Sequence, residues 1–376
     1  MVNNKILITG GAGFIGSNLS LKLISMGYKV TVLDNLSEQI HGHSSKLFKS
    51  IDGKVNFIKG DVRNAEDWHQ SLKNQDIVVH LAAETGTGQS MYEVQKYVDV
   101  NINGTAIFLD YLVNKPHSVK KVIIASSRAI YGEGMYECPS HGLIFPDARK
   151  ESDLLNGDFE PKCSICKKNL SLLPTDENAK IHPSSVYGIT KQNQEQMILN
   201  VCKSINIPAV AFRYQNVYGP GQSLQNPYTG ILSIFSTQIR NGNNINVFED
   251  GLESRDFVYI DDVVNATILG IEKQEADFEI FNVGNGKAIS VLKVAEFLKK
   301  YYQSDIEIEV SGNFRLGDIR HNVADITKIK HQLGFQPEYD FEQGILRFAK
   351  WVNEQEIHED HYLKSIQEIK DKGLFK

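Results

Sequence analysis

The stretch ILITGGAGFIGSNL, residues 6–19, decides the fold that we expect of this chain. A short apolar run leads into a turn that carries Gly10, Gly13 and Gly16 three positions apart, and a helical pattern follows. Glycine is needed where a turn takes a positive φ and where a diphosphate must approach the backbone closely. The free N–H groups at the start of the helix then favour an anion. A glycine trio that follows a strand and opens a helix therefore predicts a dinucleotide-binding site rather than a plain turn.

The N-terminal half of the chain alternates short β-branched runs with longer amphipathic segments. The strands that we expect are Lys5–Thr9, Lys29–Leu33, Val55–Lys59, Ile77–Leu81, Val122–Ser126 and Ala209–Phe212, and the helices include Ile15–Met26 and Val98–Asn114. Continuous apolar strands separated by helices are typical of a parallel sheet covered on both faces. The pattern therefore predicts an α/β protein with a Rossmann-type, doubly wound parallel sheet.

Composition and charge exclude several classes of partner. The chain has 376 residues, of which 41% are hydrophobic and 23% charged, and its net charge is −6. This mild acidity gives no general attraction to nucleic acid or to an anionic membrane. We find no signal peptide and no apolar run of the roughly 20 residues that span a bilayer. We therefore expect a cytoplasmic protein without a disulfide framework, in which Cys202 is a buried free thiol.

The order of segments suggests four parts. Residues 1–132 and 183–220 carry the alternating pattern and are expected to form the dinucleotide-binding domain. Residues 133–182 break the alternation and are expected to form an insert rich in Pro, Cys, Lys and Asn. Residues 221–352 are less regular and are expected mainly to form a smaller α+β substrate lobe. The polar tail, 353–376, carries Ile366, Ile369 and Leu374 at roughly helical spacing and is expected to form a helix.

Polar and small residues follow the second, third and fourth predicted strands. Asp34 ends the second strand, 18 positions after Gly16. A carboxylate there can accept both ribose hydroxyls of NAD and would repel the additional phosphate of NADP. Asp61, in the sequence GDV, ends the third strand where the adenine is expected, although a simple turn residue is the alternative. The small residues of HLAAETG, 80–86, let the backbone approach the cofactor.

The sequence SSVYGITKQNQE contains Tyr187 and Lys191, which share one face of a helix at positions i and i+4. A free tyrosine, with a pKa of about 10, is a poor base at neutral pH. A neighbouring ammonium and the cationic nicotinamide ring would both favour the phenolate. The pair is then able to take a hydroxyl proton while a hydride leaves for the cofactor. Ser127, after the fifth strand, could hydrogen-bond the reacting oxygen, with Ser126 as the alternative.

These residues bring the chain to a known family. The motifs TGGAGFIG, GDVRN, HLAA, SSRAIYG, RYQNVYGPGQ, RDFVYIDDV and FNVGNG, with Tyr187 and Lys191, resemble those of the extended short-chain dehydrogenase/reductase family. Within it, the chain is similar to the nucleotide-sugar epimerases and dehydratases. The resemblance covers the whole chain except the insert.

The resemblance implies a role for each matching position. It implies that Ser127, Tyr187 and Lys191 are catalytic. The implied NAD contacts are Gly10, Gly13, Phe14, Ile15, Gly16, Asp34, Asn35, Asp61, Val62, Leu81, Ala82, Ala83, Asn101, Ser126, Tyr187 and Lys191. The implied substrate contacts are Asn216 for the sugar or its phosphate, Val247 and Phe248 for the base, and Arg255, Arg315 and Asp318 for the diphosphate and ribose. Arginine suits a diphosphate because its planar fork matches phosphate oxygens.

The residues after Ser127 distinguish the reactions of this family. Its dehydratases follow the catalytic hydroxyl with an Asp-Glu pair, whereas this chain has Arg128 and Ala129. Alanine moves no proton, which argues against dehydration. A reductase usually consumes the phosphorylated cofactor, against which Asp34 argues. Redox-neutral epimerisation remains, while an NAD-linked oxidoreductase and a non-catalytic NAD-binding scaffold are the rivals.

Further motifs indicate the sugar. The stretches AAETGTGQSMYE and YQNVYGPGQSLQNPYTG, together with the insert, are similar to a subgroup of dTDP-L-rhamnose 4-epimerases, which form dTDP-6-deoxy-L-talose. The alternatives are a UDP-hexose 4-epimerase and a CDP-sugar 2-epimerase. The family resemblance also implies a nucleotide-diphosphate sugar as the partner molecule and a homodimer built through helices of the first domain.

The insert carries a Cys/His pattern. Cys138 and His141 are separated by two residues, and Cys163 and Cys166 repeat that gap. This spacing fits a zinc ribbon with three thiolates and one imidazole. A structural zinc in small peptides contributes about 10–16 kcal/mol of apparent binding energy, enough to order a polar loop. We therefore predict a structural zinc, with unligated thiols and a catalytic metal as the alternatives.

Overall fold

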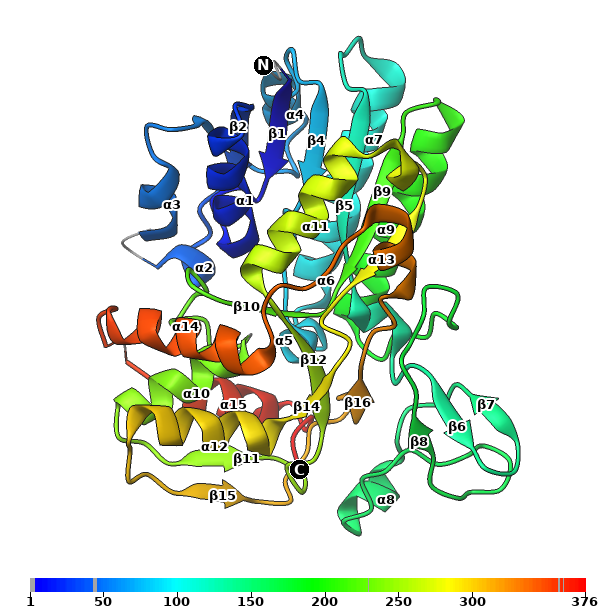
Figure 1. Cartoon of the computed structure of the whole chain (residues 1–376), viewed down its shortest axis with the longest axis vertical. Helices are drawn as coiled ribbons and strands as arrows, with labels where there is room; N and C mark the ends of the chain where they lie inside the picture. Colours follow the sequence, from blue (N-terminus) through cyan, green and yellow to red (C-terminus); the bar gives the residue numbers. More distant parts are fainter. Residues whose placement is uncertain (1–3, 43–45, 229, 358, 361) are drawn as a thin grey trace.

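A seven-stranded parallel sheet forms the centre of the protein in the computed structural model, which describes residues 4–42, 46–228, 230–357, 359–360 and 362–376 (Figure 1). Its strands are β1 (Lys5–Thr9), β2 (Lys29–Asp34), β3 (Asn56–Lys59), β4 (Ile77–His80), β5 (Lys121–Ser127), β9 (Ala209–Tyr214) and β13 (Ile280–Val283). Their order is β13-β9-β5-β4-β1-β2-β3. The predicted α/β class with a doubly wound parallel sheet is confirmed.

Both faces of the sheet are buried, because successive side chains of each strand point to opposite sides. In β1, Ile6 and Ile8 join one core and Leu7 joins the other. The helices α1 (Phe14–Ser25) and α11 (Ile260–Glu272) cover the first face, and α4 (Ala65–Ser71), α7 (Gly104–Asn114) and α9 (Val186–Ser204) cover the second (Figure 1). Apolar residues at every position of these strands therefore have a partner layer.

The strand order reverses at β1. The chain runs outward from β1 to β2 and β3, and it then returns to place β4 on the other side of β1. The loops that follow β1 and β4 diverge at this point, so a crevice opens at the carboxyl ends of the strands. This position is where an open α/β sheet of this kind binds its ligand.

The six predicted strands all form, each with ends within two residues of the prediction. The seventh strand, β13, was not predicted and pairs with β9 from Ile280 to Val283. The helix predicted over Val98–Asn114 is divided into a π-helical segment, Val98–Asn103, and α7.

A smaller lobe lies beside the large sheet. It contains β10 (Asn216–Tyr218), β12 (Ser254–Tyr259), β14 (Ala288–Ser290) and β16 (His321–Asn322), the pair β11 (Ile245–Val247) and β15 (Ile308–Val310), and the helices α10 (Ile231–Arg240), α12 (Val291–Tyr302), α13 (Thr327–Leu333) and α14 (Phe341–Asn353). The range 221–352 supplies this lobe except for β10, which comes from the range 183–220, and it also supplies α11 and β13 to the large domain.

The insert 133–182 projects from one side of the molecule (Figure 1). It forms a small antiparallel sheet of order β7-β6-β8, with β6 at Tyr136–Cys138, β7 at Gly142–Ile144 and β8 at Ser171–Leu172, and a short helix α8 at Glu151–Leu155. Its own core contains four buried side chains, from Tyr136, Cys138, Cys163 and Leu170. So few apolar residues give a small core, which makes an additional cross-link valuable.

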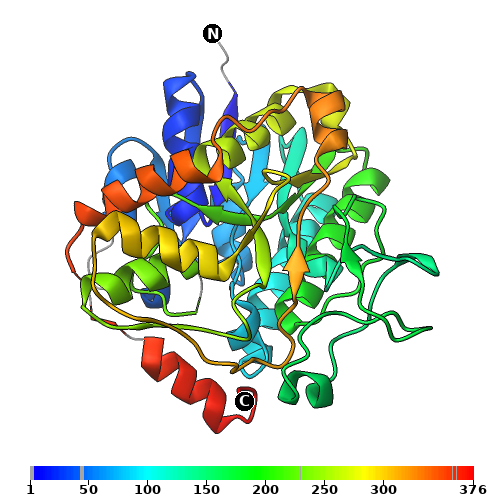
Figure 2. The ribbon, with the colours of Figure 1, turned by 60° about the horizontal axis from the view of Figure 1, so that its bottom comes forward.

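The tail forms the helix α15 (Tyr362–Asp371), which runs beneath the smaller lobe (Figure 2). Ile366 and Ile369 are buried, and Phe375 forms a bridge with Arg315. The remaining short helices are α2 (Glu38–His41), α3 (Lys46–Ile51), α5 (Thr87–Ser90), α6 (Val94–Tyr97), and the 3-10 turns Arg128–Tyr131 and Gln274–Ala276. Among the residues described, no helix combines the length and the apolar character that a membrane crossing needs.

Candidate active site

The glycine-rich turn lies between β1 and α1, and two of its glycines leave no room for a side chain. Gly10 has a φ of +67°, and a Cβ there would lie 2.8 Å from the backbone nitrogen of Ala82. A Cβ on Gly16 would lie 2.4 Å from the carbonyl oxygen of Gly10. Gly13 is the N-cap of α1 and provides no side-chain cap. The first N–H groups of the helix are therefore available to an anion.

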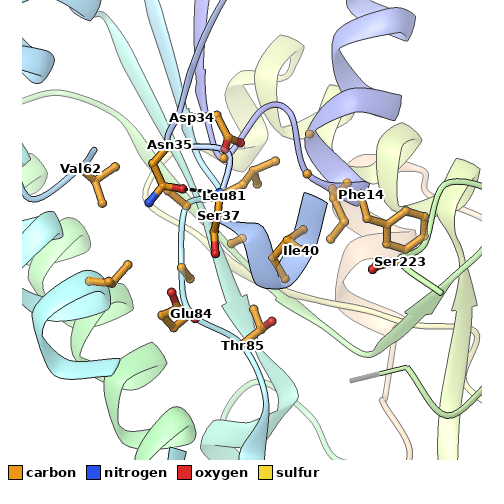
Figure 3. Close-up of a pocket in the computed structure, with 18 of the residues that line it drawn as sticks. Phe14, Asp34, Asn35, Ser37, Ile40, Val62, Leu81, Glu84, Thr85 and Ser223 are labelled. Atoms are coloured by element: carbon orange, nitrogen blue, oxygen red, sulfur yellow. Dashed lines mark hydrogen bonds between the residues drawn. The ribbon is translucent and has the colours of Figure 1, made fainter. Parts of the chain in front are cut away.

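A cavity of about 320 Å³ opens over this turn at the carboxyl ends of the central strands (Figure 3). Fifteen of the sixteen residues predicted to contact NAD line it, namely Gly10, Gly13, Phe14, Ile15, Gly16, Asp34, Asn35, Asp61, Val62, Leu81, Ala82, Ala83, Ser126, Tyr187 and Lys191. Residues outside the predicted contacts also line it, among them Ser37, Ile40, Glu84, Thr85 and Ser223 (Figure 3). Glu84 and Thr85 belong to the stretch HLAAETG, Ile40 lies in the short helix α2, and Ser37 and Ser223 lie in loops.

Two carboxylates that line this cavity are held in place by hydrogen bonds. Asp34 accepts the N–H of Ala12 at 3.0 Å, which ties the end of β2 to the glycine turn. A carboxylate has further acceptor positions that a ribose can use. Asp61 accepts hydrogen bonds from Arg63 at 2.8 Å and from Asn35 at 3.0 Å. The hydrogen bond from Arg63 holds the pKa of Asp61 well below its usual range.

Asn101 is the one predicted cofactor contact that does not line the cavity. Its side chain is fully buried, accepts the N–H of Glu84 at 2.8 Å and donates to the carbonyl of Glu84 at 3.1 Å. It also donates to Thr190 at 2.9 Å. Asn101 therefore holds the loop after β4 from behind, and Glu84 faces the cavity in its place.

The two adjacent serines at the end of β5 face different partners. Ser126 donates to the buried carboxylate of Glu195 at 2.5 Å. Ser127 hydrogen-bonds with Tyr187 and accepts the N–H of Ala129 at 3.1 Å. The structure therefore brings Ser127, and not Ser126, together with the tyrosine.

Tyr187 occupies the first turn of α9, whose N-cap Ser185 accepts the N–H of Gly188 at 3.2 Å. The cap starts the helix at this point, so that the ring faces the crevice. Burial raises the pKa of Tyr187, whereas the hydrogen bond with Ser127 and the charge of Arg128 lower it. The cation beside the phenol is therefore Arg128. From the sequence, this residue served only as evidence against dehydration.

Lys191 lies one turn further along α9 and is 3% exposed. Its ammonium donates to Gln194 at 2.8 Å, and burial lowers its pKa to about 7, with the nearby Glu195 opposing the shift. The groups that lower the pKa of Tyr187 in this structure are Ser127 and Arg128, and the influence expected of Lys191 stays a prediction. The shared helix face places both residues on the cavity, but the lysine side chain turns toward its own helix.

A second cavity, of about 380 Å³, adjoins the first. The two share six lining residues: Thr85, Ser127, Tyr187, Gln215, Val217 and Gln222. All six predicted substrate contacts line the second cavity, namely Asn216, Val247, Phe248, Arg255, Arg315 and Asp318. Ser127 and Tyr187 therefore stand where the two cavities meet.

The two predicted diphosphate contacts are anchored on one segment of backbone. Arg255 donates to the carbonyls of Ile319 at 2.8 Å and of Arg320 at 2.9 Å. Arg315 donates from Nε to the carboxylate of Asp318 at 2.8 Å. Anchoring of this kind fixes the direction of a long side chain and reduces the entropy that it loses on binding.

Val247 and Phe248 form an apolar wall of the second cavity. Val247 is fully buried. The ring of Phe248 packs edge-on against Phe375 of the tail at 5.1 Å between centroids, and the guanidinium of Arg315 lies 5.3 Å from the Phe248 centroid. The tail therefore supports this wall.

Sequence reasoning missed several groups that line the second cavity. Arg128 donates from Nε to Oδ1 of Asn216 at 2.8 Å, and its two Nη groups have no hydrogen-bond partner among the described residues. Glu253 is 8% exposed, and its Oε2 has no partner there either. Tyr228 and Tyr362 complete this side. Arg128 lies in the motif SSRAIYG and Glu253 lies close to RDFVYIDDV, so their positions near family motifs could have indicated a place in the site. Tyr362 reaches the cavity only through the fold of the tail.

The insert brings its four predicted metal ligands together. Sγ of Cys138 lies 3.5 Å from Nδ1 of His141 and 3.6 Å from Sγ of Cys166, and Sγ of Cys163 lies 3.5 Å from the same imidazole nitrogen. All four ligand atoms lie within 4.8 Å of one another. A tetrahedral zinc with Zn–S bonds of about 2.3 Å separates its ligand atoms by about 3.5–3.8 Å. The residues thus fit this metal, and none of the four lines either cavity.

Fold and site together define an NAD-dependent enzyme of the extended short-chain dehydrogenase/reductase class, with a second cavity beside the cofactor crevice. The chain belongs to the NAD-dependent epimerase/dehydratase family, which it matches over residues 6–162 and 163–284.

Individual relatives agree with this assignment. The chain is 36% identical over 354 residues to dTDP-L-rhamnose 4-epimerase from Burkholderia thailandensis, a match that covers 93% of this chain and 95% of that protein. The solved UDP-glucose 4-epimerase from Thermotoga maritima, with UDP-glucose, has a TM-score of 0.76 at 31% identity and covers 93% of this chain and 99% of its own. A UDP-N-acetylglucosamine 4-epimerase from Methanobrevibacter ruminantium, in complex with UDP-N-acetylmuramic acid, has a TM-score of 0.75 at 30% identity, with coverages of 95% and 100%. The family resemblance and the prediction of an NAD-dependent epimerase are confirmed.

Proposed function

We propose that the chain inverts C4 of a nucleotide-diphosphate sugar that occupies the second cavity, while NAD occupies the first. The observation that carries this proposal is the position of Tyr187, which lines both cavities. A group that faces the cofactor and the sugar at once can move a proton between itself and the sugar without leaving its place.

The proposed chemistry begins and ends at one hydroxyl. Tyr187 takes the proton of the C4 hydroxyl, and Ser127 hydrogen-bonds the same oxygen. The residues that line the first cavity would hold NAD, whose nicotinamide would supply reversible hydride transfer at C4. The planar 4-keto sugar turns in the cavity between the two transfers, so the hydride arrives on the opposite face. Tyr187 then gives the proton back, and no external oxidant or reductant is consumed.

The other lining residues are proposed to hold the substrate. Arg255 and Arg315 bind the diphosphate, for which their anchored guanidinium groups are suited. Asp318 binds the ribose, and Phe248 packs against the base. Asn216, fixed by Arg128, contacts the sugar or its phosphate.

For the sugar, we propose dTDP-L-rhamnose, which would become dTDP-6-deoxy-L-talose. The likeness to the Burkholderia thailandensis enzyme over nearly the whole chain supports this substrate. A UDP-hexose is the second candidate, because solved epimerases crystallised with UDP-sugars have the same fold at about the same level of identity.

A panel assay tests the proposal. The purified chain is incubated with NAD and, separately, with dTDP-L-rhamnose, UDP-glucose, UDP-N-acetylglucosamine and CDP-paratose, and the products are followed by NMR. We expect the C4 epimer of dTDP-L-rhamnose and no stoichiometric absorbance from NADH. An accumulation of NADH would identify an oxidoreductase instead. If no sugar reacts although NAD is bound, the chain is a non-catalytic scaffold.

We also propose a structural zinc held by Cys138, His141, Cys163 and Cys166. The clustering of the four ligand atoms supports it, as does the small apolar core of the insert. The metal would close the insert in the way a disulfide closes an extracellular domain. A catalytic role has no support, since none of the four residues lines either cavity.

A homodimer is proposed through α7 and α9, the exposed helices of the large domain. Val113 on α7 is 53% exposed and Ile189 on α9 is 45% exposed, which supports an apolar contact there. Light scattering at micromolar concentration tests the proposal: the mass of two chains supports it, and the mass of one chain excludes it.

A further inference from the structure

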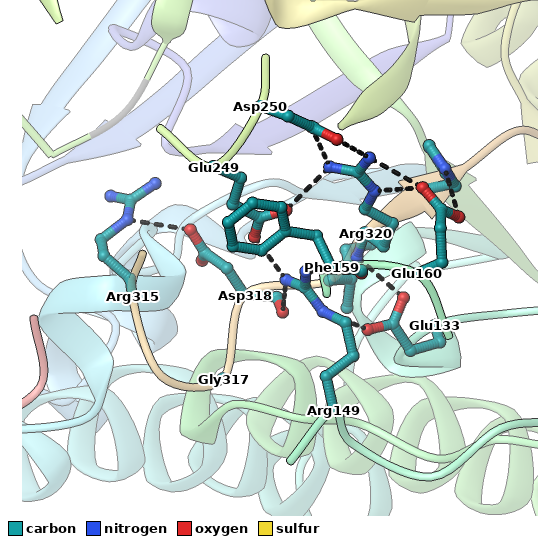
Figure 4. Close-up of polar contacts among 12 residues, drawn as sticks. Glu133, Arg149, Phe159, Glu160, Glu249, Asp250, Arg315, Gly317, Asp318 and Arg320 are labelled. Carbon is teal, nitrogen blue, oxygen red and sulfur yellow. Dashed lines mark hydrogen bonds and ion pairs between the residues drawn. The ribbon is translucent and has the colours of Figure 1, made fainter. Parts of the chain in front are cut away.

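The insert meets the smaller lobe through buried ion pairs (Figure 4). Its Arg149 has a side chain only 3% exposed. The guanidinium lies 2.7 Å from the carboxylate of Glu249 and 3.3 Å from that of Glu133. It also donates to the carbonyls of Phe159 at 3.1 Å and Asp318 at 2.8 Å. One side chain of the insert thus joins four acceptors, two of which, on Glu249 and Asp318, belong to the lobe.

Both lobe partners of Arg149 line the second cavity. The bond to the carbonyl of Asp318 fixes the backbone at that residue. The carboxylate of the same residue accepts Nε of Arg315 (Figure 4). Through one residue, the insert therefore sets the position of an arginine that faces the cavity.

The same backbone segment is held from a second point. Arg320 is 1% exposed and pairs with Glu160 of the insert at 2.7 Å and with Asp250 of the lobe at 2.7 Å. Its backbone N–H donates to Glu133 of the insert at 2.8 Å. The carbonyl of Arg320 in turn accepts Arg255. Arg255 and Arg315 are thus attached to a segment, residues 315–320, that the insert holds at Asp318 and at Arg320.

Solvent weakens the ion pairs of Arg149 with Glu133 and Glu249 little, because all three side chains are at most 4% exposed. Arginine is suited to the position of Arg149, since its planar fork presents several donors in fixed directions. A lysine can satisfy one or two of the four acceptors but not all of them. Removal of the Arg149 charge would take one cation from each of two buried carboxylates, leaving Glu249 paired with Arg320 alone and Glu133 with only the backbone N–H of Arg320.

We propose that Arg149 is a positioning residue for nucleotide-diphosphate binding, and that the insert is a brace for the arginines of the second cavity. This inference rests on the proposed function in assigning the diphosphate to Arg255 and Arg315. It goes beyond that function in giving the insert a part in substrate affinity, although none of its metal ligands reaches the cavity.

The test compares ligand binding with turnover in the full-length chain. Arg149→Met and Arg149→Lys are titrated with thymidine diphosphate, uridine diphosphate and NAD by calorimetry. Lys162→Met is the matched control, because the ion pair of this insert cation among the described residues is with Asp158, whose side chain is 42% exposed. Melting temperature and metal content are measured for each variant, and KM and kcat are measured with the sugar that the unmodified chain epimerises.

We expect Arg149→Met to weaken binding of the preferred nucleoside diphosphate by about tenfold, the effect of one lost hydrogen bond to a charged group. KM of Arg149→Met for the sugar should rise by the same factor, while its kcat and its NAD affinity stay within about twofold of the unmodified chain. The nucleoside-diphosphate affinity of Arg149→Lys should lie between those of Arg149→Met and the unmodified chain. Lys162→Met should bind the nucleoside diphosphate as the unmodified chain does. Unchanged nucleoside-diphosphate affinity in Arg149→Met overturns the proposal. So does an equal loss of NAD affinity in Arg149→Lys, since this would indicate general damage. Arg149-dependent binding in a chain that epimerises no sugar would leave the brace intact and refute only the proposed function.

Discussion

Nε of Arg128 donates to Oδ1 of Asn216 at 2.8 Å, and this bond fixes a buried guanidinium beside the phenol of Tyr187. The rest of the guanidinium is left to the second cavity. Burial lowers the pKa of Arg128 to about 9, so the group is still a cation at neutral pH. Its charge is one of two influences that lower the pKa of the tyrosine.

Replacement of Arg128 by methionine should therefore slow the reaction at neutral pH. Loss of the cation raises the pKa of Tyr187, so less phenolate is present, and we expect kcat at pH 7 to fall on the order of tenfold. The acid limb of the kcat profile should move to higher pH, because the phenolate is the active form. Arg128→Lys, which keeps a charge, should show a smaller movement. A methionine variant whose profile does not move would exclude this electrostatic role.

The adjacent serines offer a matched pair of substitutions. Ser127→Ala removes the hydroxyl that hydrogen-bonds with Tyr187, and we expect kcat to fall by about 10²-fold or more, as on loss of a positioned proton-transfer partner. Ser126→Ala removes a hydroxyl that donates to Glu195 and not to Tyr187. We expect a lower melting temperature in that variant, with kcat within a few-fold of the unmodified chain.

Tyr187→Phe completes this series. It should lower kcat by about 10²–10⁴-fold while NAD still binds, because the ring that lines the cofactor cavity is retained. Steady-state kinetics and calorimetry measure the two effects. If Ser126→Ala proved as inactive as Tyr187→Phe, the assignment of the two hydroxyls would have to be reversed.

The same serines show where sequence reasoning reaches its limit. Neighbouring side chains of a strand face opposite sides, so one of Ser126 and Ser127 had to point toward the tyrosine. The sequence does not indicate which serine this is, because packing of β5 against α9 decides which face of the strand points toward the tyrosine. By contrast, the glycine turn and the alternating strands are local patterns, and the structure reproduces them closely.

Other misses have the same origin. The strand β13, Ile280–Val283, pairs with β9 at the edge of the large sheet, although the chain before it was assigned to the smaller lobe. Asn101 lies behind the cavity because it belongs to the π-helical segment before α7, whose turn spacing no sequence pattern revealed. The contacts of Arg149 join segments far apart in the chain, and only the folded structure shows that the insert reaches the lobe.

Glu253 should make substrate affinity depend on pH. Burial raises its pKa to about 7, the charge of Arg255 opposes that shift, and the charge of Glu249 adds to it. Below pH 7 the carboxyl is neutral, and above pH 7 it is an anion in a cavity that is proposed to bind a diphosphate. We therefore expect KM for the nucleotide sugar to rise as the pH increases from about 6 to 8, since like charges repel.

The variant Glu253→Gln tests this sign directly. A neutral amide of the same shape should keep KM low and nearly constant across that pH range. KM should be measured at fixed ionic strength, because salt screens exposed charges. A rise in KM that persists unchanged in Glu253→Gln would show that the titrating group lies elsewhere, with Lys191, whose pKa is also about 7, as the next candidate.

The zinc proposal makes the final prediction. Chain purified without chelator should contain about one zinc per chain, because three thiols and one imidazole form a closed tetrahedral set. Cys163→Ser should reduce the zinc content to near zero and lower the melting temperature, since metal binding and folding of the insert are coupled. Cys202→Ala should retain the metal, because Cys202 is buried in α9, away from the cluster.

Binding measurements on the same variants test whether the metal supports the brace that the insert forms. If zinc orders the insert, then Cys163→Ser should weaken binding of the nucleoside diphosphate in the same way as Arg149→Met, because both loosen the support of residues 315–320. NAD affinity should change little, since the insert contributes no residue to the first cavity. Full zinc occupancy in Cys163→Ser would exclude the ligand set, whereas zinc loss with unchanged diphosphate affinity would show that the ion pairs hold the insert in place without the metal.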